Sequence, residues 1–96
     1  SYGIAKAAIV RYTRSLASEL GPFGIHVNAI APSLIATSRA VAQFPDREER
    51  AAHIPLRRLG TPEDVAKVVE FLVTDLSDYV TGQCVTVCGG NYLNVS

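Results

Sequence analysis

Residues 24–32 read GIHVNAIAP, and this stretch decides the fold class of the chain. It is rich in β-branched and small residues and closes at Pro32, which predicts one short strand. Apolar residues occur on both of its faces, which is typical of the interior of a parallel sheet. A second strand is predicted for QCVTVC at residues 83–88, where the side chains alternate before Gly89 and Gly90.

Two long helices accompany these strands. From Tyr2 to Leu20 apolar residues recur three and four positions apart, which predicts a helix that ends at Gly21 and Pro22. Its predicted buried face comprises Ala5, Ala8, Ile9, Tyr12, Leu16 and Leu20. The second helix is predicted to follow Thr61, a good N-cap, with Pro62 at its first position. Its predicted buried stripe comprises Val65, Val68, Val69, Leu72 and Leu76.

Between the first strand and the second helix, residues 32–60 are predicted to form loops and one or two short helices. Asp46 followed by Glu49 resembles a capping box that opens a helix through about His53. Irregular segments between regular elements often carry binding surfaces. Asn28, inside the first strand, is expected to be structural and to tie neighbouring loops together.

The order helix, strand, irregular segment, helix, strand predicts an α/β fold. Two strands joined through a helix form a crossover and should be parallel. Parallel strands normally lie in larger sheets that are covered on both faces. The sequence therefore indicates part of a doubly wound domain, with two strands, two long helices and short helices.

Composition excludes several classes of partner. Nine basic and nine acidic side chains give a net charge of zero without a run of like charges, so neither nucleic acid nor acidic lipid is an expected partner. No apolar run approaches the ~20 residues of a membrane helix, and the first residues lack the layout of a secretion signal. A soluble, cytoplasmic protein is expected.

No metal site is predicted. Cys84 and Cys88 lie roughly 13 Å apart along a strand, beyond the reach of a disulfide, so both should be free thiols. They could help to hold a metal only with ligands from elsewhere, and small buried residues are the favoured interpretation. His26 and His53 lack a partner at ligand spacing.

Four blocks, in this order and spacing, resemble the C-terminal half of a short-chain dehydrogenase/reductase. They are YGIAK at residues 2–6, GIHVNAIAP at 24–32, IPLRRLGTPEDVA at 54–66, and YVTGQ followed by GG at 79–90. The resemblance covers essentially the whole chain. It implies that residues 1–96 are the C-terminal portion of one NAD(P)-binding, Rossmann-like domain whose N-terminal cofactor-binding half is absent.

The resemblance assigns proton transfer to Tyr2. A free tyrosine titrates near ~10, and a nearby cation favours its phenolate. Lys6 lies one turn along the same helix face and could supply this field. By resemblance it also binds the nicotinamide ribose, so both residues are expected to be catalytic and cofactor-binding. Their spacing alone favours an ordinary helix start with an exposed lysine, whereas the other blocks favour the catalytic interpretation.

The resemblance also implies that the residues after the first strand, Pro32, Ser33, Ile35 and Thr37, contact the cofactor. Ile35 would offer backbone groups to the carboxamide, and Thr37 would offer its hydroxyl. Ser33 stands where the family usually has glycine, which puts a positive φ or a close backbone approach at this position in doubt. A second interpretation is that Thr37 or Ser38 caps the next short helix.

The expected function is interconversion of a carbonyl and a secondary alcohol with NAD or NADP, by the full-length protein. The 96 residues alone are expected to be inactive, and poorly folded or oligomeric. The alternative is a truncated, non-catalytic relative that acts as an oligomerisation subunit. The substrate would be a small molecule, and a homo-tetramer or dimer is expected by resemblance. The apolar residues of the expected pocket wall favour apolar or acyl-like substrate groups; they are Leu34, Val41, Phe44, Ile54 and Leu56.

Overall fold

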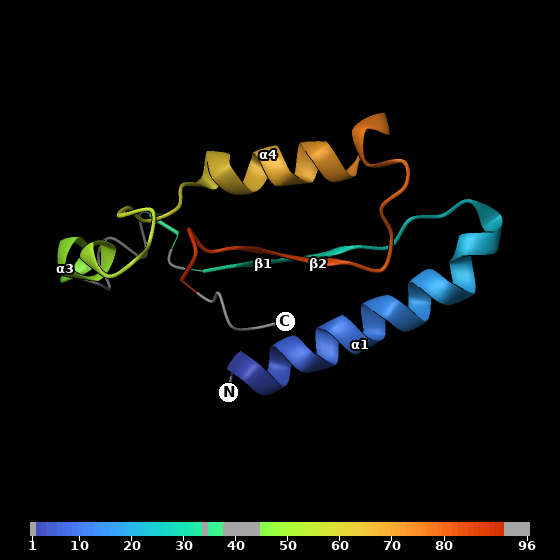
Figure 1. Ribbon diagram of the computed structural model, residues 1–96, viewed down its shortest axis with the longest axis horizontal. Helices are drawn as coiled ribbons and strands as arrows, with labels where there is room; N and C mark the ends of the chain where they lie inside the picture. The colour runs from blue at the N-terminus through green and yellow to red at the C-terminus, as the bar shows by residue number, and fades with distance from the viewer. Residues whose placement is uncertain (1, 34, 38–44, 92–96) are drawn as a thin grey trace. The chain divides into compact units, whose positions relative to one another are not determined.

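The computed structural model describes residues 2–33, 35–37 and 45–91 of the chain (Figure 1). In chain order its elements are α1 (Tyr2–Leu20), the 3-10 helix η1 (Gly21–Phe23), β1 (Ala29–Pro32), α3 (Arg47–Ala52), α4 (Pro62–Leu72), the 3-10 helix η2 (Asp75–Ser77) and β2 (Cys84–Val87). β1 and β2 form a two-stranded sheet.

The two strands run parallel. The Ala29 N–H donates to the Gln83 carbonyl at 2.8 Å, and the Ser33 N–H donates to the Val87 carbonyl at 3.0 Å. Donor and acceptor advance together along the chain, which is the hydrogen-bond order of a parallel pair. The predicted α/β fold class is therefore confirmed.

The chain divides into two compact units. The first comprises residues 1–31 and 69–85, and the second comprises residues 32–68 and 86–96. The first unit holds α1 and the amino-terminal residues of both strands. The second holds the segment after β1, α3, and the residues that follow β2.

In the first unit, α1 has the predicted bounds but buries a different face. Thr13 and Ala17 are only 5% and 7% exposed, whereas Ile9 and Tyr12 are 50% and 67% exposed. Leu16 and Leu20 of the predicted face are half-buried and its other residues are exposed, so the prediction was only partly correct. The reason is close approach by small residues, because a Cβ on Gly82 would lie 3.3 Å from the Cβ of Ala17. Thr13 can be buried because its hydroxyl donates to the Ile9 carbonyl at 2.7 Å.

Asn28 ties two loops of the first unit together, as predicted. Its side-chain amide donates to the Val80 carbonyl at 3.2 Å, and its side-chain oxygen accepts from the Gln83 N–H at 3.0 Å. One residue earlier, the Val27 N–H donates to the Thr81 hydroxyl at 2.9 Å. These side-chain bonds replace a strand ladder, so β1 begins at Ala29 and not at the predicted Gly24.

α4 begins as predicted but ends at Leu72. Three residues of its predicted buried stripe are half-buried, namely Val65, Val68 and Leu72. Val69 is 42% exposed. Leu76 lies beyond the helix, in η2, and is 74% exposed, so the stripe was only partly correct.

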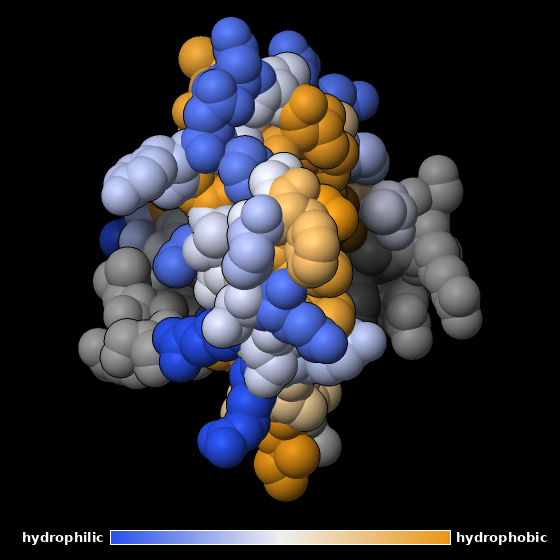
Figure 2. Space-filling view, turned by 90° about the vertical axis from the view of Figure 1, so that its right-hand side faces the viewer, coloured by the Kyte–Doolittle hydropathy of each residue, from blue (hydrophilic) through white to orange (hydrophobic). Residues whose placement is uncertain are grey.

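Large apolar side chains lie at the surface of the first unit. Phe23 and Val73 are each 76% exposed, and Tyr79 is fully exposed. Figure 2 looks onto the side on which η1 lies and shows apolar side chains, in orange, between polar ones. Scattered exposure of this kind is ordinary and identifies no binding surface by itself.

In the second unit, the turn after β2 packs closely on residues 54–56. A Cβ on Gly89, whose φ is 60°, would lie 2.9 Å from the Cγ2 of Ile54, which is itself 3% exposed. A Cβ on Gly90, whose φ is 92°, would lie 2.9 Å from the Pro55 ring. The Leu56 N–H donates to the Gly89 carbonyl at 3.0 Å. Both glycines are therefore required by backbone conformation and by space.

α3 lacks the predicted capping box. The N-cap residue is Asp46, but its side chain makes no capping hydrogen bond. Its carboxylate instead accepts from the Arg50 Nε, at 3.1 Å to each oxygen. Because an ion pair one helical turn away takes the carboxylate, the reciprocal bonds expected with Glu49 do not form.

The two cysteines are free thiols, as predicted. Cys84 lies in β2, Cys88 directly follows this strand, and both are half-buried.

Candidate functional site

The predicted proton-transfer pair lies at the start of α1. Tyr2 is the first residue of the helix, and its side chain lies outside the described part of the structure. Lys6 follows one turn later and is only 9% exposed. Lysine is rarely this buried, so the interpretation of Lys6 as an ordinary exposed residue is wrong.

The predicted cofactor segment, residues 32–37, belongs to the second unit. Pro32 ends β1 and is exposed. Ser33 continues the strand ladder to Val87, and Ile35 forms an isolated parallel bridge with Gly60. The structure thus describes Tyr2 and Lys6 in one unit and the 32–37 segment in the other.

The backbone N–H and carbonyl of Ile35 itself point away from Gly60. The bridge is made by the neighbouring Ala36, whose N–H donates to the Gly60 carbonyl at 2.8 Å. Successive residues of an extended segment point their backbone groups in opposite directions, so those of Ile35 point to the other side. The Ile35 carbonyl accepts from the Thr37 N–H at 2.9 Å and keeps a second lone pair.

Ser33 does not adopt the left-handed conformation that a glycine would allow. In the described part of the chain, Arg57, with a φ of 60°, is the one non-glycine residue with positive φ. Ser33 is half-buried, and its N–H is used by Val87. The serine therefore fits this position without the backbone freedom of glycine.

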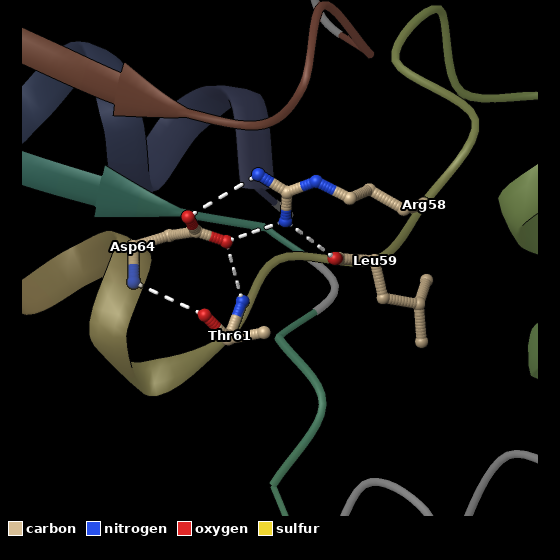
Figure 3. A network of polar contacts seen from close by, with 4 residues as sticks. All are labelled: Arg58, Leu59, Thr61 and Asp64. Carbon is tan, nitrogen blue, oxygen red and sulfur yellow. Dashed lines mark hydrogen bonds and ion pairs between the residues drawn. The ribbon is translucent and has the colours of Figure 1, made fainter.

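A polar network lies just before and within the first turn of α4 (Figure 3). The Asp64 carboxylate accepts from the Arg58 guanidinium at 2.6 and 3.2 Å and from the Thr61 N–H at 2.8 Å. In return the Asp64 N–H donates to the Thr61 hydroxyl at 3.1 Å. The predicted N-cap at Thr61 is confirmed, and it is one half of a reciprocal capping box.

The network shifts the pKa values of its two charged members. The Arg58 hydrogen bond, followed by the Thr61 backbone N–H, holds the pKa of Asp64 far below its ordinary value. The hydrogen bond and negative charge of Asp64 raise the pKa of Arg58. Both side chains contact solvent, so the pair stays ionised at neutral pH without a large energetic effect.

Gly60 joins this network to the 32–37 segment, and the sequence interpretation missed its role. A Cβ on Gly60 would lie 2.6 Å from the Cδ1 of Ile35. Its φ lies outside the left-handed region, so the requirement is for space. The signal in the sequence is the glycine of RLGTP, directly before the helix cap.

The rest of the predicted pocket wall is only partly described. Ile54 is buried, and Leu56 is 65% exposed. Leu34, Val41 and Phe44 lie outside the described residues, as does Ser38, the alternative capping residue.

A separate pocket lies in the first unit and has a volume of about 230 Å³. Its lining residues are His26, Asn28, Ile30, Val69, Leu72 and Val73. None of them is a predicted site residue.

The helices of the described residues include none that combines the length and the apolar character needed to cross a membrane.

Comparison with known proteins gives the family. A family model described as enoyl-(acyl carrier protein) reductase matches residues 1–91. The chain is 50% identical over 91 residues to a cyclohexanol dehydrogenase of Rhodococcus sp. (strain TK6). The match covers 93% of this chain and 34% of that protein.

Solved structures show the same likeness. A 3-oxoacyl-(acyl-carrier protein) reductase from Brucella melitensis ATCC 23457 superimposes with a TM-score of 0.85 and 45% identity, over 91% of this chain and 33% of that one. A 3-oxoacyl-(acyl-carrier protein) reductase from Brucella melitensis with bound NAD gives a TM-score of 0.76 and 46% identity, over 91% and 31%. The chain spans about a third of the length of these relatives. By its sequence and its fold, it belongs to the short-chain dehydrogenase/reductase family of oxidoreductases.

Proposed function

We propose that the protein to which this chain belongs is an NAD(P)-dependent oxidoreductase that interconverts a carbonyl and a secondary alcohol. The observation that carries the proposal is the family match over residues 1–91, which includes Tyr2, Lys6 and the 32–37 segment. The cyclohexanol dehydrogenase and the 3-oxoacyl reductases among the relatives are named for this class of chemistry.

Tyr2 is the proposed proton donor in reduction and the proton acceptor in oxidation. An unperturbed tyrosine titrates near ~10 and exchanges its proton poorly at neutral pH. Lys6 lies one turn along α1 and is only 9% exposed as a residue, and its ammonium group would favour the phenolate. A charge exerts a stronger field where water is excluded, which is why the burial of Lys6 supports this role.

The proposed cofactor is NAD or NADP, as in the solved relative that holds NAD. The polar groups of the 32–37 segment suit a nicotinamide, because the backbone groups of Ile35 point away from Gly60 and Thr37, an exposed residue, carries a hydroxyl. Pro32 and Ser33 lead the chain from β1 into this segment. Lys6 would bind the ribose. The nicotinamide, when bound, supplies or accepts the hydride.

The remaining proposals concern the whole protein. We expect a small-molecule substrate, a cytoplasmic location, and a homodimer or tetramer. The exposure of Ile4, Ile9 and Tyr12 on α1 supports a subunit contact on this helix. We expect the 96 residues alone to be inactive, because the main cofactor-binding half is expected elsewhere in the protein.

The test uses the full-length protein. We expect it to oxidise NADPH or NADH in the presence of cyclohexanone or a 3-oxoacyl thioester, measured as the loss of absorbance of the reduced nucleotide. A folded protein that bound neither nucleotide, in a direct titration, would contradict the proposal.

A further inference from the structure

Gly60, which lies before α4, holds the 32–37 segment through backbone contacts. Ile35 bridges to Gly60, and the Ala36 N–H donates to the Gly60 carbonyl at 2.8 Å. Because a peptide unit is planar, fixing the Ala36 N–H also fixes the carbonyl of Ile35. The position of Gly60 therefore determines where the backbone of Ile35 lies.

Gly60 allows this contact because it has no side chain. A methyl group added at its Cα would meet the Cδ1 of Ile35 first, at 2.6 Å. Carbon atoms that are not bonded prefer separations of about 3.5 to 4.0 Å, so an alanine would push Ile35 aside. The clash is with the end of the Ile35 side chain, and a valine at that position would lack the clashing atom.

Gly60 is in turn fixed from both sides by the Asp64 carboxylate. On its carboxyl side, the Thr61 N–H donates to Asp64 at 2.8 Å. On its amino side, Arg58 donates to Asp64 and also to the Leu59 carbonyl at 3.2 Å (Figure 3). The Asp64 carboxylate thus binds residues on both sides of Gly60.

We propose that Gly60 and Asp64 are positioning residues, which hold the backbone of residues 35–37 in place for the nicotinamide and so set the affinity for the nucleotide without touching it. This inference rests on the proposed function. It assigns a role to the RLGTPED block that lies outside the catalytic pair and outside the segment proposed to contact the cofactor.

A second ion pair of the same unit provides a matched control. Arg50 and Asp46 are joined at 3.1 Å, with side chains 42% and 48% exposed. The carboxylate accepts from a residue one turn along its own short helix. Removing the Asp46 carboxylate changes the surface charge as much as removing the Asp64 carboxylate, and it leaves Gly60 untouched.

The experiment measures dissociation constants for NADH and NADPH, by nucleotide fluorescence, together with thermal melting of the full-length protein. Gly60→Ala is expected to weaken binding about tenfold, and Asp64→Asn about threefold, the range of coupling between contacting groups. Asp46→Asn is expected to bind like the wild type. In an Ile35→Val background, Gly60→Ala should weaken binding by less than about threefold, because the clashing Cδ1 is gone.

The rescue shows that the contact with the Ile35 Cδ1 causes the loss of affinity, and the melting temperature separates positioning from general destabilisation. A wild type that bound neither nucleotide would overturn the proposed function and this inference with it. A wild type that bound, with a folded Gly60→Ala that bound within about twofold of it, would overturn the inference alone. If Gly60→Ala does not fold, Asp64→Asn decides: unchanged affinity overturns the inference, and weaker binding by a variant that remains folded at the assay temperature supports it.

Discussion

The amino-terminal ends of β1 and β2 are tied by side-chain hydrogen bonds, whereas the segments after their carboxyl-terminal ends pack through glycines. In the first unit, Asn28 bonds to Val80 and Gln83. In the second unit, Gly60 meets the end of the Ile35 side chain, and Gly89 meets Ile54, at distances at which an added Cβ would force a shift. Parallel α/β sheets bind ligands at the carboxyl ends of their strands, and glycines leave the backbone accessible there. The amino-terminal ends are thus joined by the side-chain hydrogen bonds of Asn28, and the segments after the carboxyl-terminal ends pack closely at glycines.

The largest effect is expected at Gly89. Gly89→Ala would place a Cβ 2.9 Å from the Cγ2 of the buried Ile54, at a φ of 60°. Strain and overpacking together should lower the free energy of unfolding by about 2–4 kcal/mol, measured by urea denaturation of the full-length protein. Gly24→Ala is the matched control, since Gly24 also has a positive φ, of 75°, and a Cβ there would have nothing within 4 Å. Equal losses at both glycines would contradict the role of close packing.

The next largest effect is expected at Asn28. Asn28→Ala removes a donor to Val80 and an acceptor for the Gln83 N–H, and should lower the free energy of unfolding by about 1–3 kcal/mol. Gln83→Ala keeps the backbone N–H and removes only an exposed side chain, so it should cost less than about 0.5 kcal/mol. Nucleotide affinity in folded Asn28→Ala should be unchanged, and a selective loss of binding would break the distinction between the two ends.

A smaller effect is expected at Arg57, which has a φ of 60° in the second unit. Both Arg57→Gly and Arg57→Ala remove the bond from the guanidinium to the Ile54 carbonyl at 2.8 Å. They differ in tolerance of the left-handed conformation, so the glycine variant should be more stable by about 1 kcal/mol. At most positions glycine is the less stable of the two. The more stable variant in urea denaturation therefore shows whether this turn is strained.

The smallest effect is the pH dependence contributed by Asp64. Its pKa in the folded protein is lowered from the ordinary value of 3.8, so its contribution to stability is present above that value. The contribution is lost as the pH falls below 3.8 toward the lower pKa of the folded state. Between pH 6 and about pH 3, the stability difference between wild type and Asp64→Asn should therefore shrink. Asp46→Asn is the control, and a difference that grew on acidification would contradict the sign.

Local signals in the sequence were sufficient for the end of α1 and the start of α4. Gly21 and Pro22 mark the end of α1, and Thr61 with Pro62 marks the start of α4. The same reasoning failed at Asp46, where Arg50 takes the carboxylate. The difference lies in the partners of the two side chains. The Thr61 hydroxyl accepts from the Asp64 N–H within the cap, whereas the Asp46 carboxylate is taken by the Arg50 cation one turn along the helix.

Contacts between distant parts of the chain could not be predicted from local patterns. The buried face of α1 follows from the contact of Ala17 with Gly82, which no periodicity reveals. The candidate site shows the same division. Tyr2 and Lys6 stand four residues apart in one helix and could be recognised as a pair, whereas the bridge between Ile35 and Gly60 depends on the fold.

The central claim is that this chain carries the proton-transfer pair of an oxidoreductase. The most direct test compares Tyr2→Phe with Tyr79→Phe, a control at a fully exposed tyrosine, in the full-length protein. We expect Tyr2→Phe to lower kcat by at least about a hundredfold, the usual contribution of a proton donor, while both variants bind NADH and NADPH like the wild type. Turnover by folded Tyr2→Phe at the wild-type rate would contradict the assignment.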